Sequence, residues 1–218
     1  SRIFYFDNFL ELSAFNIFFT SFCLLILLNG SNFIDGLNAL LLIYMTTVIY
    51  ILLDLNLKLL VEINEPYTLF LFMTLILVII LNIKNNLMLG DSGGYVLSFF
   101  VGYLVIQCHK FNPNISPYFF ITLLWYPCFE NLFSIIRKLK NNYTPLAADN
   151  SHLHQLIYQR LSKVLYKNKL VANNASSILI SLINVIILLF AARNPYETIY
   201  QIKVILISIL LYLLTYFI

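Results

Sequence analysis

Charged residues are scarce in this chain of 218 residues. Asp, Glu, Lys and Arg together make up 11% of it, whereas about 25% is typical of soluble domains. Hydrophobic residues make up 61% and the mean hydropathy is +0.85. This shortage of charge argues against a soluble globular domain. We expect the partner of the apolar surface to be a membrane, and we expect no nucleic-acid partner.

Cysteine is also rare, with only Cys23, Cys108 and Cys128. The three lie far apart, no pair has the spacing of a metal site, and an odd number offers no complete disulfide framework. We therefore expect the cysteines to act as small buried hydrophobic residues.

Long apolar runs fill most of the chain. About 20 apolar residues are needed to cross the hydrocarbon core as a helix, and open strands cannot cross lipid. The sequence therefore predicts an all-α, polytopic membrane helix bundle that forms a single domain over residues 1–218. About seven transmembrane helices are expected, at residues 12–28, 38–54, 67–83, 95–108, 117–136, 171–192 and 199–218.

Three polar segments interrupt the apolar runs, at residues 29–38, 90–94 and 149–154. With seven spans, all three lie on the same side of the membrane. Basic residues favour the cytoplasmic side, and more of them fall in the loops after the first, third and fifth spans than on the opposite side. These are Lys84, Arg137, Lys138, Lys140, Arg160, Lys163, Lys167 and Lys169. The three polar segments are therefore predicted to be cytoplasmic.

In the first segment, Asn29, Asn32, Asp35 and Asn38 recur at every third position. Positions three apart are neighbours on a helix surface, so one side of a helix end would present three amides and a carboxylate. The alternative is a polar loop that caps helices, since Asn and Asp are preferred caps.

In the second segment, Asp91 lies between Gly90 and Ser92, just before an apolar span. Its carboxylate is a suitable oxygen ligand for Mg²⁺, and backbone N–H groups at a helix start can bind phosphate. Stabilisation of the helix dipole by Asp91 is the simpler alternative.

The third segment holds His152 and His154 and follows the basic end of the fifth span at Arg137. Imidazoles and positive charges could hold phosphate oxygens. A basic loop that meets anionic lipid is the alternative. Glu130 lies inside the fifth span, where an ionisable residue is costly and is a functional candidate, although pairing with Arg137 could also explain it.

Taken together, these segments resemble the polyprenyl-phosphate N-acetylhexosamine-1-phosphate transferases, the MraY/WecA-like membrane family of glycosyltransferase family 4. The resemblance covers about residues 20 to 165, and its motifs occur in family order. The matching positions are Asn29-x-x-Asn32-x-x-Asp35-Gly36, Met88-Leu89-Gly90-Asp91-Ser92-Gly93, Pro127-x-x-Glu130 leading to Arg137-Lys138, and Pro145-x-x-x-Asp149-x-x-His152-x-His154.

The resemblance implies a reaction in which a polyprenyl phosphate attacks a UDP-amino-sugar and yields a polyprenyl-diphosphate sugar and UMP. It implies a multi-pass protein of the bacterial cytoplasmic membrane with Mg²⁺ as cofactor. The implied catalytic residues are Asp35, Asp91 and His152. Asn32 and Asp91 would hold the metal, and the implied substrate-binding residues are Asn29, Asn38, Arg137 and His154.

The chain also departs from the family pattern. The Asp-Asp pair of the family does not occur here, Asn38 stands where many relatives have Asp, and Gln155 replaces a third His. Family members have about ten or eleven spans, so we expect the N-terminal helices of the family fold to be missing from this chain. Two other functions are left open, a catalytically inactive scaffold that binds lipid-linked sugars and a transporter. A homodimer is left open as well.

Overall fold

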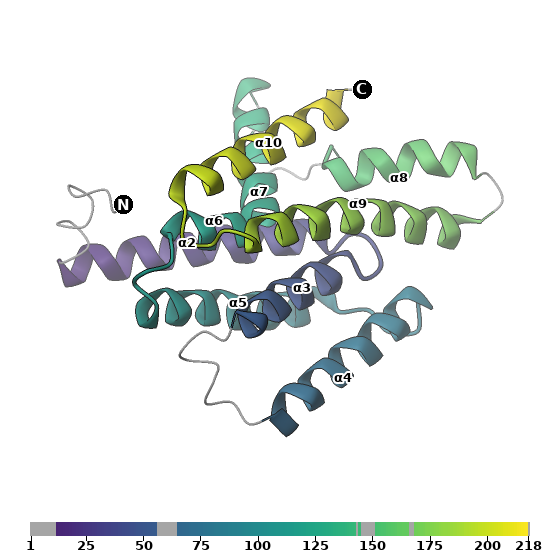
Figure 1. Cartoon of the computed structure of the whole chain (residues 1–218). Helices are drawn as coiled ribbons and strands as arrows, with labels where there is room; N and C mark the ends of the chain where they lie inside the picture. The colour runs from purple at the N-terminus through teal and green to yellow at the C-terminus, as the bar shows by residue number, and fades with distance from the viewer. Residues whose placement is uncertain (1–11, 56–64, 143, 145–150, 166–167, 218) are drawn as a thin grey trace.

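The computed structural model describes residues 12–55, 65–142, 144, 151–165 and 168–217 (Figure 1). Secondary structure in this part of the chain is entirely helical, which confirms the predicted fold class. The helices are α2 (Ser13–Ile34), α3 (Leu40–Asp54), α4 (Glu65–Ile83), α5 (Gly90–Phe111), α6 (Pro117–Leu123), α7 (Trp125–Lys140), α8 (Leu153–Val164), α9 (Lys169–Ala192) and α10 (Thr198–Phe217).

Four helices, α2, α4, α9 and α10, are both long enough and apolar enough to cross a membrane. A fifth span results if α6 and α7, which are bent by 75° relative to each other, are counted as one. The chain is therefore a multi-pass membrane protein by helix length and composition. The expected number of about seven spans is not confirmed.

Helix α3 is one of the expected spans that is not among these candidates. It has 15 residues, which at about 1.5 Å per residue is shorter than the hydrocarbon core of about 30 Å. Its side chains are buried by neighbouring helices, and Leu40, Met45, Val48 and Leu52 are fully shielded from solvent. An apolar run of this length is therefore explained by the protein core as well as by lipid.

Tyr44 of α3 forms hydrogen bonds to both sides of the break between α6 and α7. The Tyr44 hydroxyl donates a hydrogen bond of 2.9 Å to the carbonyl oxygen of Leu123, the last residue of α6, and accepts one of 3.4 Å from the backbone N–H of Tyr126. Pro127 has no N–H to continue the helical hydrogen bonds back into α6. The chain therefore changes direction here, and α7 leads away at a fixed angle.

Helix α2 packs most closely against α7 and α5 (Figure 1). At the crossing with α7, a Cβ atom on Gly30 would lie only 1.9 Å from the Pro127 carbonyl oxygen. The Asn131 side chain donates to the Ile26 carbonyl oxygen at 3.1 Å. The sequence thus places a glycine where the two helix backbones nearly touch, and this contact fixes the end of α2 beside α7.

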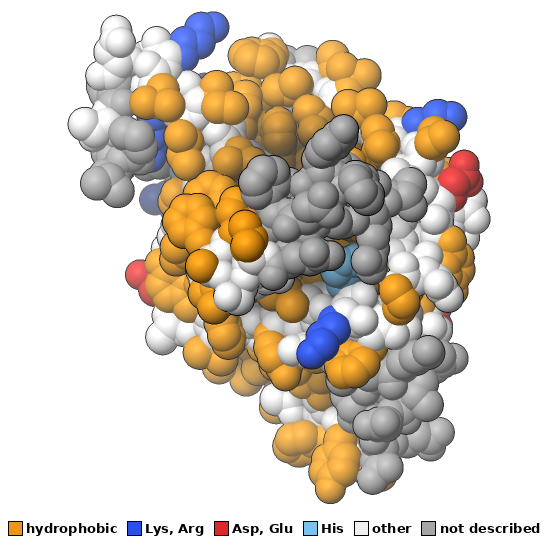
Figure 2. All heavy atoms as spheres, turned by 90° about the vertical axis from the view of Figure 1, so that its left-hand side faces the viewer, with side chains coloured by type: hydrophobic (Ala, Val, Ile, Leu, Met, Phe, Trp, Pro, Cys, Tyr) orange, Lys and Arg blue, Asp and Glu red, His pale blue; other side chains and the backbone are white. Residues whose placement is uncertain are grey.

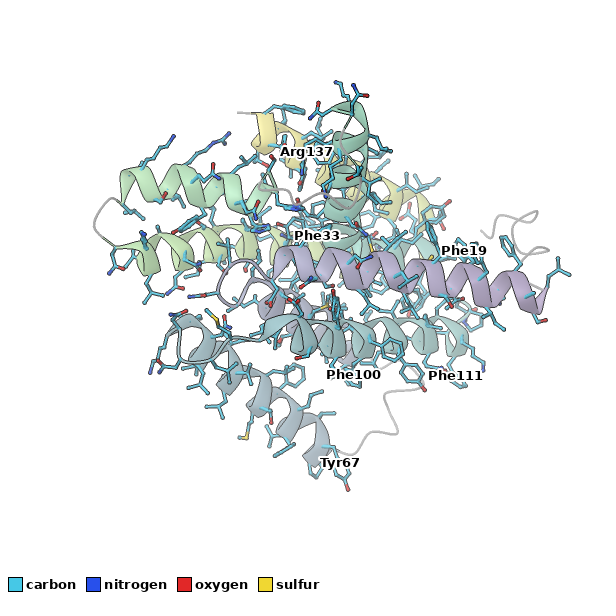
Figure 3. The ribbon with its side chains drawn as sticks, turned by 180° about the vertical axis from the view of Figure 1, so that it is seen from behind. Phe19, Phe33, Tyr67, Phe100, Phe111 and Arg137 are labelled. Atoms are coloured by element: carbon cyan, nitrogen blue, oxygen red, sulfur yellow. The ribbon has the colours of Figure 1, made fainter. Side chains whose placement is uncertain are left out.

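Hydrophobic side chains cover much of the outer surface (Figure 2). Exposed aromatic residues include Tyr67 on α4 and Phe100 and Phe111 on α5 (Figure 3). Such a surface suits a lipid environment. The prediction that all cysteines are buried is wrong for Cys23, which is exposed on α2, whereas Cys108 is buried.

Candidate functional site

The first two polar segments meet at the ends of α2 and α5. Asp35 is the residue that caps the C-terminus of α2, and Asp91 lies in the first turn of α5. Burial, and next the nearby charge of Asp91, raise the pKa of Asp35 to about 7. The Asn32 side chain donates to the Tyr95 hydroxyl at 3.3 Å, which also links α2 to α5. The ends of α2 and α5, which carry the two predicted site carboxylates, therefore lie side by side.

Two neighbouring carboxylates suit a magnesium ion, because Mg²⁺ is commonly held by one or two carboxylates together with waters and substrate phosphates. The donor set of Asp35, Asp91 and Asn32 fits this pattern. Within the described residues, no group of three or more His, Cys, Asp and Glu side chains could hold a metal ion. A complete protein cage for a metal is therefore absent from this part of the chain.

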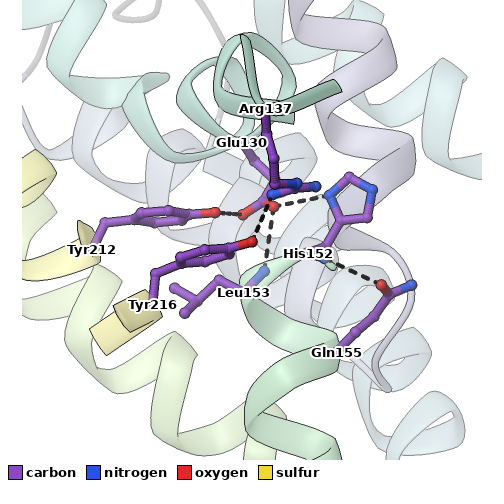
Figure 4. Close-up of polar contacts among 7 residues, drawn as sticks. All are labelled: Glu130, Arg137, His152, Leu153, Gln155, Tyr212 and Tyr216. Carbon is purple, nitrogen blue, oxygen red and sulfur yellow. Dashed lines mark hydrogen bonds and ion pairs between the residues drawn. The ribbon is translucent and has the colours of Figure 1, made fainter. Parts of the chain in front are cut away.

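Glu130 is the centre of a buried polar network (Figure 4). Its carboxylate accepts a hydrogen bond of 2.7 Å from the Tyr212 hydroxyl and lies 2.9 Å from His152 Nδ1. The backbone N–H of Leu153 also points to it at 3.4 Å. These partners of Glu130 are a tyrosine, a histidine and a backbone N–H. Glu130 thus fixes the start of α8 against α7 and α10.

His152 is the residue that precedes α8, and its backbone N–H donates to the Gln155 side-chain oxygen at 3.3 Å. This is the reciprocal arrangement of a capping box. Its ring also packs on Phe33 from the end of α2, with 4.7 Å between the ring centroids. The histidine segment therefore lies against the polar end of α2, two residues from Asp35.

The His154 ring stacks on the His152 ring, with the two centroids 5.7 Å apart. The His154 side chain is fully buried, and neither ring nitrogen has a hydrogen-bond partner. Burial lowers the pKa of His154 to about 4, so the ring is neutral at physiological pH. A Cβ atom on Gly36 would lie 2.6 Å from His154 Nε2. The glycine thus lets the histidine pack directly on the turn that follows Asp35.

Asn38 is engaged with the protein itself. Its side chain donates to the Asn174 side-chain oxygen at 3.0 Å, and its backbone N–H donates to the Asn173 side-chain oxygen at 2.9 Å. Both partners lie on α9. The structure therefore gives Asn38 a bridging role between the α2–α3 turn and α9, and the sequence-based assignment to substrate binding stays a prediction.

Arg137 lies beside the Glu130 network (Figure 4) and contacts α10. Arg137 donates a hydrogen bond of 3.2 Å to the Tyr216 hydroxyl, and its guanidinium group lies over the Phe133 and Tyr216 rings at 5.5 and 5.6 Å. Asn29 is exposed on α2. Their predicted contacts with substrate stay predictions. Asp149 of the histidine motif lies outside the described residues.

Sequence reasoning missed four residues that organise this region: Asn82, Asn173, Asn174 and Tyr212. The three asparagines lie near the ends of apolar helices, and an amide at such a position was the available signal. Tyr212 lies in an apolar helix rich in aromatic residues, where nothing distinguishes it before the fold is known.

Comparisons with models of known protein families, with curated proteins and with solved structures found no match.

Proposed function

We propose that this protein transfers the sugar-1-phosphate of a UDP-N-acetylhexosamine to a polyprenyl phosphate at the cytoplasmic face of a bacterial membrane. The observation that carries the proposal is the meeting of three polar segments at one end of the bundle. Asp35 interacts with Asp91, and Phe33 and Gly36 contact the two histidines of the third segment. Separate motifs of the resemblance thus come together in three dimensions.

The reaction consists of one displacement at phosphorus. An oxygen of the lipid phosphate forms a bond to the sugar-bearing phosphorus, and the bond from that phosphorus to the bridging oxygen of the uridine phosphate breaks. UMP leaves with the electron pair of the broken bond. In reactions of this class the protein mainly positions the groups and stabilises charge.

Asp35, Asp91 and Asn32 are the residues that would hold Mg²⁺, with the donor substrate supplying further oxygens. Bound magnesium neutralises the negative charge of a diphosphate. His152 is held at Nδ1 by Glu130, which leaves Nε2 as the ring nitrogen that could contact a phosphate oxygen. A carboxylate that fixes the orientation of a histidine ring in this way sets which nitrogen is available to substrate.

An open apolar groove supports a lipid as acceptor. It runs along α5 and is lined by Ser92, Gly93, Val96, Leu97 and Phe100. Ser92 follows Asp91 directly, so the groove begins beside the acidic pair. A polyprenyl phosphate carries its charged group at the end of a long apolar chain, and this arrangement could accept both parts at once.

The test uses the protein expressed from its full gene and placed in lipid nanodiscs with undecaprenyl phosphate. We expect release of UMP from UDP-N-acetylhexosamines that depends on Mg²⁺, and we expect Asp91→Asn to lower turnover by at least tenfold. Asp54→Asn is the matched control, since Asp54 is exposed at the far end of α3. Equal turnover in Asp91→Asn and the unsubstituted protein would contradict the proposal.

A second function is favoured by two observations. The described residues hold no group of three His, Cys, Asp or Glu for a metal, and the sequence has no Asp-Asp pair. An inactive scaffold that binds lipid-linked sugars fits this pattern. It predicts binding of a polyprenyl-diphosphate sugar to the nanodisc sample with no release of UMP under any metal condition.

A further inference from the structure

Asn82 occupies an unusual place between the two acidic segments. It lies in the last turn of α4 and its side chain is only 7% exposed. The side-chain oxygen accepts a hydrogen bond from the backbone N–H of Ala39, and the side-chain nitrogen donates to the carbonyl oxygen of Leu87 at 2.8 Å. A single carboxamide therefore joins two backbone segments that are distant in sequence.

Both of these backbone groups would otherwise lack a partner. Ala39 has a left-handed backbone conformation and precedes the first residue of α3, where N–H groups have no acceptor within the helix. Leu87 lies in the connection between α4 and α5. Loss of the Asn82 amide would leave a buried N–H and a carbonyl oxygen unsatisfied, which is costly.

The two segments that Asn82 joins are those that carry the acidic pair. Ala39 lies four residues after Asp35, and Leu87 lies four residues before Asp91. The contact at Asn82 therefore ties together the two backbone segments that carry the carboxylates.

Asn174 of α9 forms a second bridge between the same two segments. Its side-chain oxygen accepts from the Asn38 side chain at 3.0 Å, and its nitrogen donates to the carbonyl oxygen of Ile83 at 3.0 Å. Asn38 belongs to the turn after Asp35, and Ile83 is the last residue of α4. Two amides thus hold the same pair of segments, one directly and one through α9.

We propose that Asn82 is a positioning residue whose side-chain amide sets the separation of Asp35 and Asp91. The proposal rests on the proposed function, in which the two carboxylates share a divalent cation. Mg²⁺ requires oxygen ligands at 2.0–2.1 Å in near-octahedral geometry. Because Asp91 is exposed on the first turn of α5, its position depends on how the preceding connection is anchored.

The first measurement follows distance and does not depend on activity. Spin labels are attached at positions 29 and 88, which are exposed on the two sides of the contact, in the full-length protein with its native cysteines replaced. Double electron–electron resonance then gives the distribution of distances between the labels. We expect Asn82→Leu, which keeps the branching of the side chain and removes both hydrogen bonds, to shift or broaden this distribution.

Asn184→Leu is the matched control, because Asn184 is equally buried and its side chain donates within its own helix, to Ile180 at 3.0 Å. This control should leave the distribution unchanged. Asn174→Leu removes the second bridge and should broaden the distribution as well, which keeps the proposal testable if Asn82→Leu fails to fold. A distribution that stays narrow in the folded Asn82→Leu or Asn174→Leu variant would overturn the proposal.

The second measurement uses Mn²⁺ in place of Mg²⁺ and records its binding by electron paramagnetic resonance. We expect Asn82→Leu to weaken Mn²⁺ binding about tenfold, as is typical when a residue that supports metal ligands is removed. If the unsubstituted protein does not bind Mn²⁺, the magnesium part of the proposed function fails, and the distance measurement still decides the role of Asn82. Normal Mn²⁺ affinity in Asn82→Leu would contradict the proposal.

Discussion

The bond between Glu130 and Tyr212 can be tested by a double-mutant cycle. Glu130 is fully buried, and the Tyr212 hydroxyl donates to its carboxylate at 2.7 Å. A hydrogen bond to a charged group contributes about 1.5–3 kcal/mol, so Tyr212→Phe should lower the free energy of unfolding by about 2 kcal/mol. The lost bond leaves the carboxylate with its contacts to His152 and the Leu153 backbone.

Glu130→Gln should cost more than Tyr212→Phe. The glutamine is neutral, and its side-chain NH₂ group would face donors where a carboxylate oxygen accepted before. Removal of one member of a buried charged pair costs about 3–5 kcal/mol, and glutamine keeps one accepting oxygen. We expect a loss of about 3 kcal/mol for this variant. His152 then loses the partner that orients its ring.

The coupling between the two substitutions is the informative quantity. Residues in direct contact show coupling energies of about 0.5–3 kcal/mol, so the double variant should be less destabilised than the sum of the two single variants. Unfolding is measured in mixed micelles by titration with sodium dodecyl sulfate and followed by far-UV circular dichroism. Each variant is compared with the unsubstituted protein under the same lipid and detergent conditions.

Tyr200→Phe supplies the control for this cycle. Tyr200 lies on the same helix, and its hydroxyl donates to the Phe190 carbonyl oxygen at 2.7 Å. Twelve residues along α10 correspond to about 18 Å, so Tyr200 is too distant to couple with Glu130. The effects of Tyr200→Phe and Glu130→Gln should add to within about 0.5 kcal/mol. Additivity of Tyr212→Phe with Glu130→Gln would refute the contact on which the network depends.

Three further predictions concern the end of α2 and its packing. The pKa of Asp35 is raised to about 7 from 3.8, so folding favours its protonated form. The folded protein should lose stability as the pH rises from about 4 to 7, and Asp35→Asn should flatten this decline. The free energy of unfolding is measured against pH without divalent ions, and equal slopes in the two proteins would contradict the prediction. Gly30→Ala places a Cβ 1.9 Å from the Pro127 oxygen and should destabilise the fold by about 1–3 kcal/mol. An unchanged thermal unfolding temperature would contradict this prediction. In Gly94→Ala the added Cβ meets only a leucine methyl group at 3.5 Å, so this variant should be neutral or stabilise α5 by up to about 1 kcal/mol. If it loses as much stability as Gly30→Ala, close backbone approach is not the cause of the Gly30→Ala effect.

The fold class followed from the composition, because a chain with this little charge and such long apolar runs has few alternatives to membrane helices. The number of spans did not follow. Helix α3 is apolar because the protein buries it, and α6 and α7 bend at a break that is held by Tyr44 from another helix. An apolar run has the same sequence signal in the protein core and in lipid, so only packing distinguishes them.

Parts of the site were also visible in the sequence. The regular spacing of Asn32 and Asp35, the position of Asp91 before an apolar span, and the charge of Glu130 within one are local features that need no contacts to be recognised. Their chemistry depends on polar groups that are expensive to bury, which is why they stood out from the apolar sequence.

What the residues contact was decided by the tertiary structure. Glu130 bonds to His152 and Tyr212, which come from segments 22 and 82 positions away in the sequence. Asn38 has the same amide as Asn32, yet α9 engages only the first of them. A side chain's hydrogen-bonding capacity is set by its chemistry, whereas its partner is whichever group the packing of distant helices brings within about 3 Å.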